Sequence, residues 1–116
     1  MRKYTEKLFD KKFIEGKKSY KVGNHKINTI GNSIYLSYHG NNIILIDFLD
    51  KKIIIDNCNY DTISTIQAIN SHLEGINDYL FNKDKFEFIV IGYNNKDNLK
   101  HDKLIKSLFG KTAIHL

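Results

Sequence analysis

The sequence has no proline and no tryptophan, and its 116 residues include one cysteine, one arginine and two alanines. A single cysteine excludes a disulfide framework and any cysteine-rich zinc site. No apolar run approaches the roughly 18 residues of a membrane span, and residues 1–7 lack the apolar region of a signal peptide. We therefore expect a soluble, cytoplasmic protein with no membrane partner.

Lysine, isoleucine and asparagine are abundant, with 17, 18 and 13 copies. Their codons are rich in A and T, whereas those of proline, alanine and arginine are mostly rich in G and C, so part of the net charge of +5 reflects the genome. The isoleucines, seven phenylalanines and seven tyrosines supply enough apolar side chains for a core. A chain of this length has room for one core, so we expect a single domain over 1–116.

The net charge is uneven along the chain. It is +6 over residues 1–26, −4 over residues 27–82 and +3 over residues 83–116. Two basic segments that meet in space would attract a phosphate backbone or an acidic protein surface. Lysines on solvated faces are the alternative, because a chain with one arginine lacks the side chain favoured in bidentate recognition of phosphates and bases.

Residues 3–15 predict an amphipathic helix that ends at Gly16. From Tyr20 onward the apolar residues follow a period of two, between glycine-asparagine pairs that favour turns. The apolar residues of the predicted helix share one stripe: Tyr4, Leu8, Phe9, Phe13 and Ile14.

Residues 33–55 predict a three-stranded antiparallel meander. Apolar residues alternate with others in 33–38, which is typical of a strand with one buried side. The run 43–49 is too short for a membrane span and too β-branched to favour a helix, so we expect a central strand covered on both faces. A turn at 50–52 then leads into the isoleucines 53–55.

After residue 62 the apolar spacing becomes three and four, which predicts a long helix with one buried stripe. Asp61 or Thr62 can cap its start, and Gly75 marks either a kink or a close packing contact. The stripe consists of Ile63, Ile66, Ile69, Leu73, Ile76 and Leu80.

A further strand is predicted over 86–93, followed by a last amphipathic helix that Asp97 or Asn98 caps and Gly110 ends. The predicted order is an N-terminal helix, an antiparallel β-meander, a long helix, a further strand and a C-terminal helix. This order is typical of the α+β class, with helices covering one face of a mainly antiparallel sheet.

The five histidines are scattered, and no two have the i, i+4 spacing that places two metal ligands on one side of a helix. We expect each in a turn or on a solvated face. Cys58 follows a predicted strand, and a nucleophilic role would need a histidine, of which His72 is the nearest in sequence. A small half-buried cysteine is the ordinary alternative.

Asp47, Asp50, Asp56 and Asp61 are predicted near the ends of adjacent strands, where nuclease carboxylates gather around Mg²⁺. A small Mg²⁺-dependent nuclease would use Asp47, Asp56 and Glu87. The usual nuclease pattern is Glu-x-Lys, and no such lysine follows Glu87. No glycine-rich phosphate loop is present either. We therefore expect a protein that is not an enzyme and needs no cofactor or metal.

Aromatic residues interleaved with basic ones are the remaining signal, because tyrosine can stack on single-stranded nucleic acid while lysines follow the backbone. Tyrosines that seal the margin of a core are the alternative. Tyr35 faces away from Ile34 and Leu36 in the predicted strand, so we expect it on an open sheet face. The candidate binding residues are Lys11, Lys12, Lys17, Lys18, Lys21, Tyr35, Tyr38, Tyr93 and Lys96.

Residues 32–46 and 61–70 resemble small uncharacterised phage and mobile-element proteins of AT-rich Gram-positive bacteria. In those proteins a strand of the type I-x-L-x-S-Y leads through a hairpin to a helix that begins Y-S-x-T-T-x-x-H-I-N. Here 64–65 match the hydroxyl pair and 69–70 match the end of the motif. The departures are Asp61, Thr62 and Ala68, which stand in place of the motif's Tyr, Ser and His.

Such proteins include accessory and anti-defence factors, among them anti-CRISPR proteins, that act by binding. The resemblance implies an accessory protein that binds and modulates or inhibits a host or defence protein or nucleoprotein complex. Direct binding of single-stranded or structured nucleic acid is the alternative, and the small nuclease is the third hypothesis. The first helix can pack on its own core or on a second copy, which leaves a homodimer open.

Overall fold

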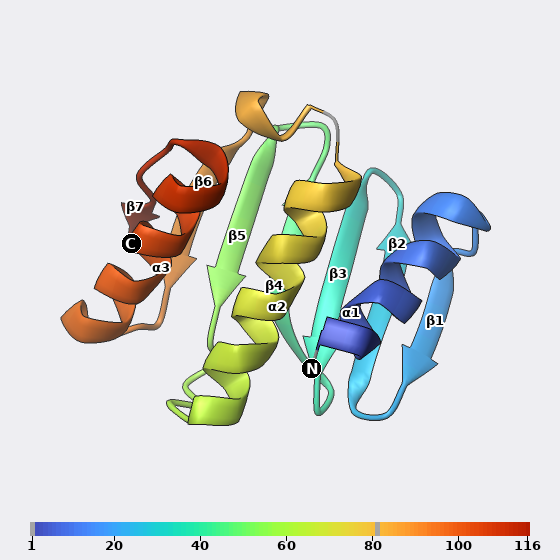
Figure 1. Ribbon diagram of the computed structural model, residues 1–116, viewed down its shortest axis with the longest axis horizontal. Coiled ribbons are helices and arrows are strands. Elements are labelled where there is room, and N and C mark those ends of the chain that lie inside the picture. The colour runs from blue at the N-terminus through green and yellow to red at the C-terminus, as the bar shows by residue number, and fades with distance from the viewer. Residues whose placement is uncertain (1, 81) are drawn as a thin grey trace.

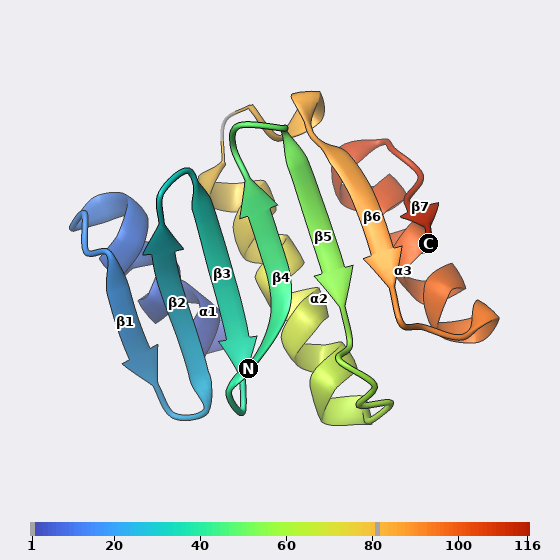
Figure 2. The same ribbon diagram turned by 180° about the vertical axis from the view of Figure 1, so that it is seen from behind.

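The computed structural model describes residues 2–80 and 82–116, and in this part of the chain seven strands form one sheet (Figure 1). The described helices lie on one face, which leaves the other face of the sheet uncovered (Figure 2). The strands are β1 (Ser19–Val22), β2 (His25–Ile30), β3 (Ser33–Tyr38), β4 (Asn41–Asp47), β5 (Lys52–Asp56), β6 (Glu87–Ile91) and β7 (Ile114–His115). The helices are α1 (Arg2–Phe9), α2 (Ile63–Tyr79) and α3 (Asn95–Phe109), with a π-helical turn η1 (Asp10–Ile14) and a 3₁₀ turn η2 (Lys83–Lys85).

The sheet is mixed, and its strands lie side by side in their order along the chain. Neighbours from β1 to β5 are antiparallel, whereas β6 lies parallel to β5 and β7 parallel to β6. Parallel neighbours need a crossover connection, and α2 and α3 provide the two crossovers. The predicted α+β class and element order are confirmed, with an antiparallel meander of five strands instead of three.

The core lies between the helices and one side of the sheet. Ile44 and Ile46 of β4 are fully buried on this side, but Leu45 between them points to the uncovered face and is only half-buried. The predicted cover of 43–49 on both faces is therefore wrong. The described helices all lie on one side, so the continuous apolar run has a packed face and an open face.

The predicted N-terminal helix is present as α1 and η1. Leu8 and Phe9 are fully buried in the core of their own chain, so this helix packs on its own domain. Ile14 was expected on the same stripe but is 74% exposed. The wider π-helical turn carries it away from the packed side.

The helix caps agree with the prediction at two of three positions. The Thr62 hydroxyl accepts a hydrogen bond from the Thr65 amide at 3.3 Å and caps α2, and Gly110 ends α3 with a φ of 70°. The cap predicted at Asp97 or Asn98 is wrong, because the side chain of Asn94 accepts from the amide of Asp97 at 3.0 Å. Neither α2 nor any other helix in the described ranges combines the length and apolar character needed to cross a bilayer.

Gly75 forms a close packing contact, which is one of the two alternatives, a kink or a close contact, that the sequence allows. A Cβ atom at this position would lie 2.5 Å from Thr5 Cγ2 and 2.9 Å from Phe9 Cε2. Both contacts belong to α1, so the glycine allows α1 to approach α2 closely. Neither neighbour has room to move, because Thr5 and Phe9 are fully buried.

We expect Gly75→Ala to lower the free energy of unfolding, measured by urea denaturation. Alanine gains about 1 kcal/mol in helix propensity, but overpacking a core costs typically about 1–3 kcal/mol. Gln67→Ala, on the exposed side of the same helix, is the matched control and should change stability by less than about 0.5 kcal/mol. A Gly75→Ala protein at least as stable as the parent would contradict the proposed contact.

Candidate functional site

The uncovered face of the sheet is organised in rows, because the strand register places side chains opposite one another. One row runs across five strands through Asn28, Tyr35, Leu45, Ile54 and Ile89. Four of its members are aromatic or aliphatic, and all five are at least partly buried by their neighbours. The centre of the open face is therefore apolar although no described helix covers it.

A basic and polar row lies beside the apolar one, toward the β3–β4 hairpin. Lys21 is opposite Lys26, Lys26 is opposite Ser37, and Ser37 is opposite Asn42. The Ser37 hydroxyl donates to Asn42 Oδ1 at 2.9 Å. Both lysines are exposed. The β1–β4 half of the open face thus carries positive charge.

The basic and polar row, together with Asn28 and Tyr35 of the apolar row, lines a hollow of about 610 Å³. Its lining combines one aromatic ring, two ammonium groups and three amides without any carboxylate. The lining residues are Lys21, Asn24, Lys26, Asn28, Ile30, Tyr35, Ser37, Gly40 and Asn42. A ring offers a stacking surface, ammonium groups attract phosphates, and amides both donate and accept hydrogen bonds.

The β4–β6 half of the face has the opposite charge. Asp47 is opposite Lys52, Lys52 is opposite Glu87, and Asp56 lies at the other end of β5. The antiparallel pairing of β4 and β5 separates Asp47 from Asp56. The three carboxylates that the nuclease hypothesis needs are therefore not gathered. In residues 2–80 and 82–116, no three histidine, cysteine or acidic side chains are placed to hold a metal ion.

The lysines predicted near the N-terminus occupy different surroundings. Lys11 pairs with Glu15 at 3.1 Å and lies over the ring of Tyr20, and Lys12 lines a separate hollow beside Asn32. The other two, Lys17 and Lys18, are exposed in the segment before β1. Lys21 is the member of this group that lines the hollow on the open face.

The three predicted tyrosines do not share one surface. Tyr35 lines the hollow, but Tyr38 lies an odd number of residues further along β3 and faces the helix side, against the rings of His25 and His39. Tyr93 follows β6 and packs on His101 with ring centroids 4.3 Å apart. Burial, and then the nearby carboxylates, raise the pKa of the Tyr93 hydroxyl.

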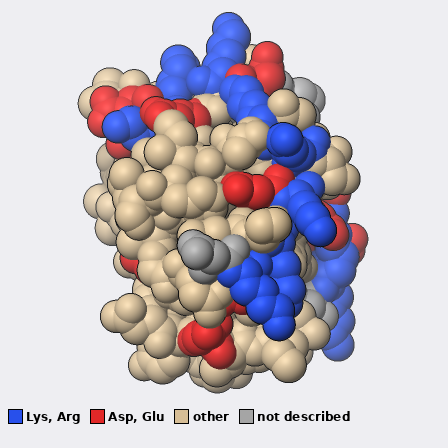
Figure 3. All heavy atoms as spheres, turned by 90° about the vertical axis from the view of Figure 1, so that its left-hand side faces the viewer, with Lys and Arg blue, Asp and Glu red and all other residues tan. Residues whose placement is uncertain are grey.

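The two basic segments of the sequence lie at opposite edges of the sheet, because β1 is one edge and β7 is the other. They therefore do not form one patch. Four of the seven lysines of the C-terminal segment, including the predicted Lys96, are exposed on α3, and Figure 3 shows basic side chains gathered along this part of the molecule. The exposed lysines of α3 are Lys96, Lys100, Lys103 and Lys106.

Lys26, which the sequence places among the interleaved aromatic and basic residues, belongs to the candidate site. Asn28 and Asn42 belong to it as well, although the sequence prediction did not include them. Lys26 and Asn28 alternate with the buried His25 and Ile27, which is the pattern of a strand with one open face. That signal is present in the sequence.

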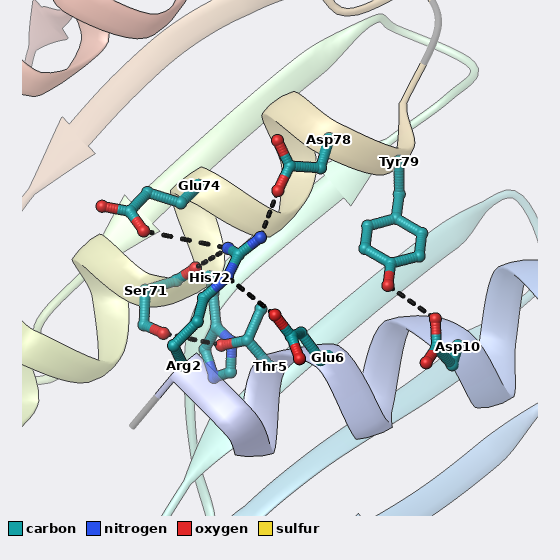
Figure 4. A network of polar contacts seen from close by, with 9 residues as sticks. All are labelled: Arg2, Thr5, Glu6, Asp10, Ser71, His72, Glu74, Asp78 and Tyr79. Atoms are coloured by element: carbon teal, nitrogen blue, oxygen red, sulfur yellow. Dashed lines mark hydrogen bonds and ion pairs between the residues drawn. The ribbon is translucent and has the colours of Figure 1, made fainter.

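Three of the five histidines are buried, so their expected place in turns or on solvated faces is wrong for His25, His72 and His101. The Thr5 hydroxyl is 2.9 Å from His72 Nδ1 and 2.8 Å from the Ser71 hydroxyl (Figure 4). On the other side of the ring, His72 Nε2 is 3.3 Å from His25 Nδ1. These bonds join α1, α2 and β2 through one buried network.

Burial lowers the pKa of His72 to about 3 and that of His101 to about 4, and it also lowers the pKa of His25. Both ring nitrogens of His72 are engaged, so it is not free to activate Cys58. The Cys58 thiol instead donates to the carbonyl of Asn42 at 3.1 Å, and burial raises its pKa. Cys58 is thus the half-buried cysteine of the ordinary alternative.

Arg2 links α1 to α2 at the protein surface. Its guanidinium forms ion pairs with Glu6, Glu74 and Asp78, and the Tyr79 hydroxyl donates to Asp10 at 2.5 Å (Figure 4). Exposed ion pairs contribute little individually, but several carboxylates around one guanidinium neutralise its charge. Arg2 therefore adds nothing to a phosphate-binding surface.

We expect the protein to lose stability below about pH 6.5. The folded pKa values of the buried histidines are lower than the unfolded value of about 6.5, so protons bind preferentially to the unfolded chain as the pH falls. For His72 alone, this linkage costs roughly 2 kcal/mol between about pH 7.5 and about pH 5. Urea denaturation at several pH values measures it.

His72→Gln should be less stable than the parent at neutral pH but should lose less stability on acidification. His39→Gln, in an exposed turn, is the control and should keep the parent's pH dependence. Equal acid sensitivity of the parent and His72→Gln would show that His72 is not the titrating group.

Compared with models of protein families, with curated proteins and with solved structures, the chain matches none of them. Its fold and surface define a small α+β domain with one open sheet face. The function is therefore inferred from the residues on that face.

Proposed function

We propose that this protein binds single-stranded nucleic acid on the β1–β4 half of its open sheet face. The observation that carries this proposal is the hollow around Tyr35, which two lysines and three asparagines line without a carboxylate. A sheet face that presents an aromatic ring is a common platform for unstacked bases, and nearby lysines contact the phosphates.

Each group in the hollow has a distinct part in this binding. The ring of Tyr35 stacks on a base, and the ammonium groups of Lys21 and Lys26 lie one row away to meet the backbone. The amides of Asn28 and Asn42 contact the edges of bases, since an amide both donates and accepts. Asp47, at the end of β4 far from the β3–β4 hairpin, and Glu87 repel phosphates, so the strand follows the part of β1–β4 near that hairpin.

We propose binding without catalysis. The carboxylates of β4, β5 and β6 lie apart, and His72 makes hydrogen bonds at both ring nitrogens. Histidine is the most common general base, and carboxylate side chains also serve in this role. The hollow is lined by none of these side chains.

We expect Tyr35→Ala to weaken binding of a fluorescent oligonucleotide about 5- to 150-fold, because loss of one stacked base costs about 1–3 kcal/mol. Tyr35→Phe keeps the ring and should bind nearly as the parent does.

The double variant Lys21→Ala, Lys26→Ala should lower the slope of log affinity against log salt concentration by about 1.4, or about 0.7 for each phosphate contact. Fluorescence anisotropy over a salt series measures both effects.

The double variant Lys103→Ala, Lys106→Ala is the matched control, because it removes the same charge from α3. Its effect on oligonucleotide affinity should be small. No binding by the parent protein at low salt would refute the proposed function. Equal losses in the two double variants would place the interface elsewhere.

A phage or mobile-element accessory role, with inhibition of a host or defence protein or nucleoprotein complex, is the second candidate function. Its support is the row of exposed lysines on α3, beside which Leu99 is 54% exposed. A row of cations around an apolar side chain suits an acidic protein surface, since charge complementarity steers association.

The accessory role predicts capture of a protein partner from nuclease-treated host lysate. The charge reversal Lys100→Glu, Lys103→Glu should abolish this capture, because it turns attraction into repulsion on α3. The variant Lys21→Ala, Lys26→Ala should retain it. Capture that disappears on nuclease treatment would favour the nucleic-acid function instead.

A further inference from the structure

A second hollow of about 250 Å³ lies at the end of the β3–β4 hairpin, between that hairpin and the start of α2. Three aromatic rings, those of Tyr38, His39 and Tyr60, contribute to its lining. The remaining lining residues are polar except for one isoleucine: Asn41, Ile43, Asn57, Thr62, Ser64 and Thr65. No carboxylate, lysine or arginine belongs to this set.

The hairpin wall of this hollow is shaped by a bulge and a tight turn. Leu36 pairs with Ile44 but Ser37 pairs with Asn42, so Ile43 is an extra residue in β4 and is buried. His39 and its neighbour Gly40 both have positive φ, at 51° and 79°, which suits a two-residue hairpin turn.

The hairpin tip separates the two hollows. Gly40 and Asn42 line the larger one on the open face, whereas His39 and Asn41 line the smaller one. Successive residues of the tip thus alternate between the two sites. A strand that crosses the open face reaches the smaller hollow by passing over this tip.

The opposite wall, in the β5–α2 loop, is held in place by hydrogen bonds. Asp56 Oδ1 accepts from the Cys58 amide at 2.8 Å, and Asn57 Oδ1 accepts from the Asn59 amide at 3.0 Å. The Cys58 thiol ties this loop to the hairpin through the carbonyl of Asn42. A Cβ atom at Gly92 would lie 2.5 Å from Asn57 Oδ1, so the glycine leaves room for the loop.

The size and lining of the small hollow restrict what can occupy it. Sites for drug-sized ligands measure roughly 300–1,000 Å³, so this hollow takes a smaller group. Aromatic walls favour a flat ring, and hydroxyl and amide groups favour an edge that carries donors and acceptors. Since no lysine or arginine lines it, the favoured group is uncharged. A nucleobase has all three properties.

We infer that the hollow beside Tyr60 is a second subsite, which takes one base of a single strand that crosses the open face and passes over the β3–β4 hairpin. This inference rests on the proposed function. It adds a binding site on the helix side of the sheet and a direction for the bound strand.

The test compares oligothymidylates of about four and about twelve nucleotides, which bracket the span of one binding domain. Tyr60→Ala should weaken binding of the long oligonucleotide about 5- to 150-fold, because one stacked base is lost, and should leave the short one unchanged. Tyr60 is 53% exposed, so its truncation should not unfold the protein. Tyr60→Phe, which keeps the ring, should bind both oligonucleotides as the parent does.

The outcomes separate this inference from the proposed function. If Tyr35→Ala weakens both oligonucleotides and Tyr60→Ala weakens neither, the second subsite is overturned and the open-face function stands. If Tyr60→Ala weakens both lengths equally, the small hollow is not a second subsite. If free thymidine monophosphate binds as tightly as the long oligonucleotide, the hollow is a mononucleotide site and the strand path is overturned. If the parent binds neither length, the proposed function fails.

Discussion

The open sheet face depends on the handedness of two crossovers. The strands β5, β6 and β7 follow one another in a single direction across the sheet, and α2 and α3 connect them in parallel. Such connections are nearly always right-handed, so two crossovers that advance in the same direction place their helices on the same face. α1 buries its apolar stripe against α2 and joins that layer (Figure 1). One helical layer and one uncovered sheet face therefore follow from the topology.

The contact between α1 and α2 shows how these two helices are fixed in position relative to each other. Gly75 permits close approach, and the polar atoms that this approach buries must find partners within the protein. Thr5, Ser71, His72 and His25 satisfy one another there. Removal of Thr5, His72 or His25 leaves a buried partner unpaired, which costs more than the bond itself contributes. His25 and His72 thus belong to the hydrogen-bond network that fixes α1 against α2. This network requires both imidazole rings to be neutral.

Periodicity predicted what depends on local pattern, namely the three helices, the strands from 33 to 55 and the exposed side of Tyr35. It could not predict pairings between distant segments. Nothing near β5 indicates that it pairs in parallel with β6, and His25 and His72 are 47 residues apart in sequence yet share a hydrogen bond. The same limit applies to the sites. Lys26 and Asn28 had a local signal, but the small hollow arises where a hairpin meets the β5–α2 loop, and no local signal marks that meeting.

Net charge is a poor guide to the proposed binding surface, because the fold redistributes the charge. The basic N-terminal segment places Arg2 among three carboxylates and Lys11 beside Glu15, so these cations are compensated. The lysines of α3 lie on the helical side of the sheet, away from the open face. On the β1–β4 half of the open face the cations are Lys21 and Lys26, which lie opposite each other and next to the row that holds Tyr35. Two cations are enough where no carboxylate lines the same hollow, since attraction for a phosphate depends on the nearest charges and is screened beyond about 10 Å. The local absence of acidic side chains, more than the excess of lysine, makes this half of the sheet suited to a polyanion.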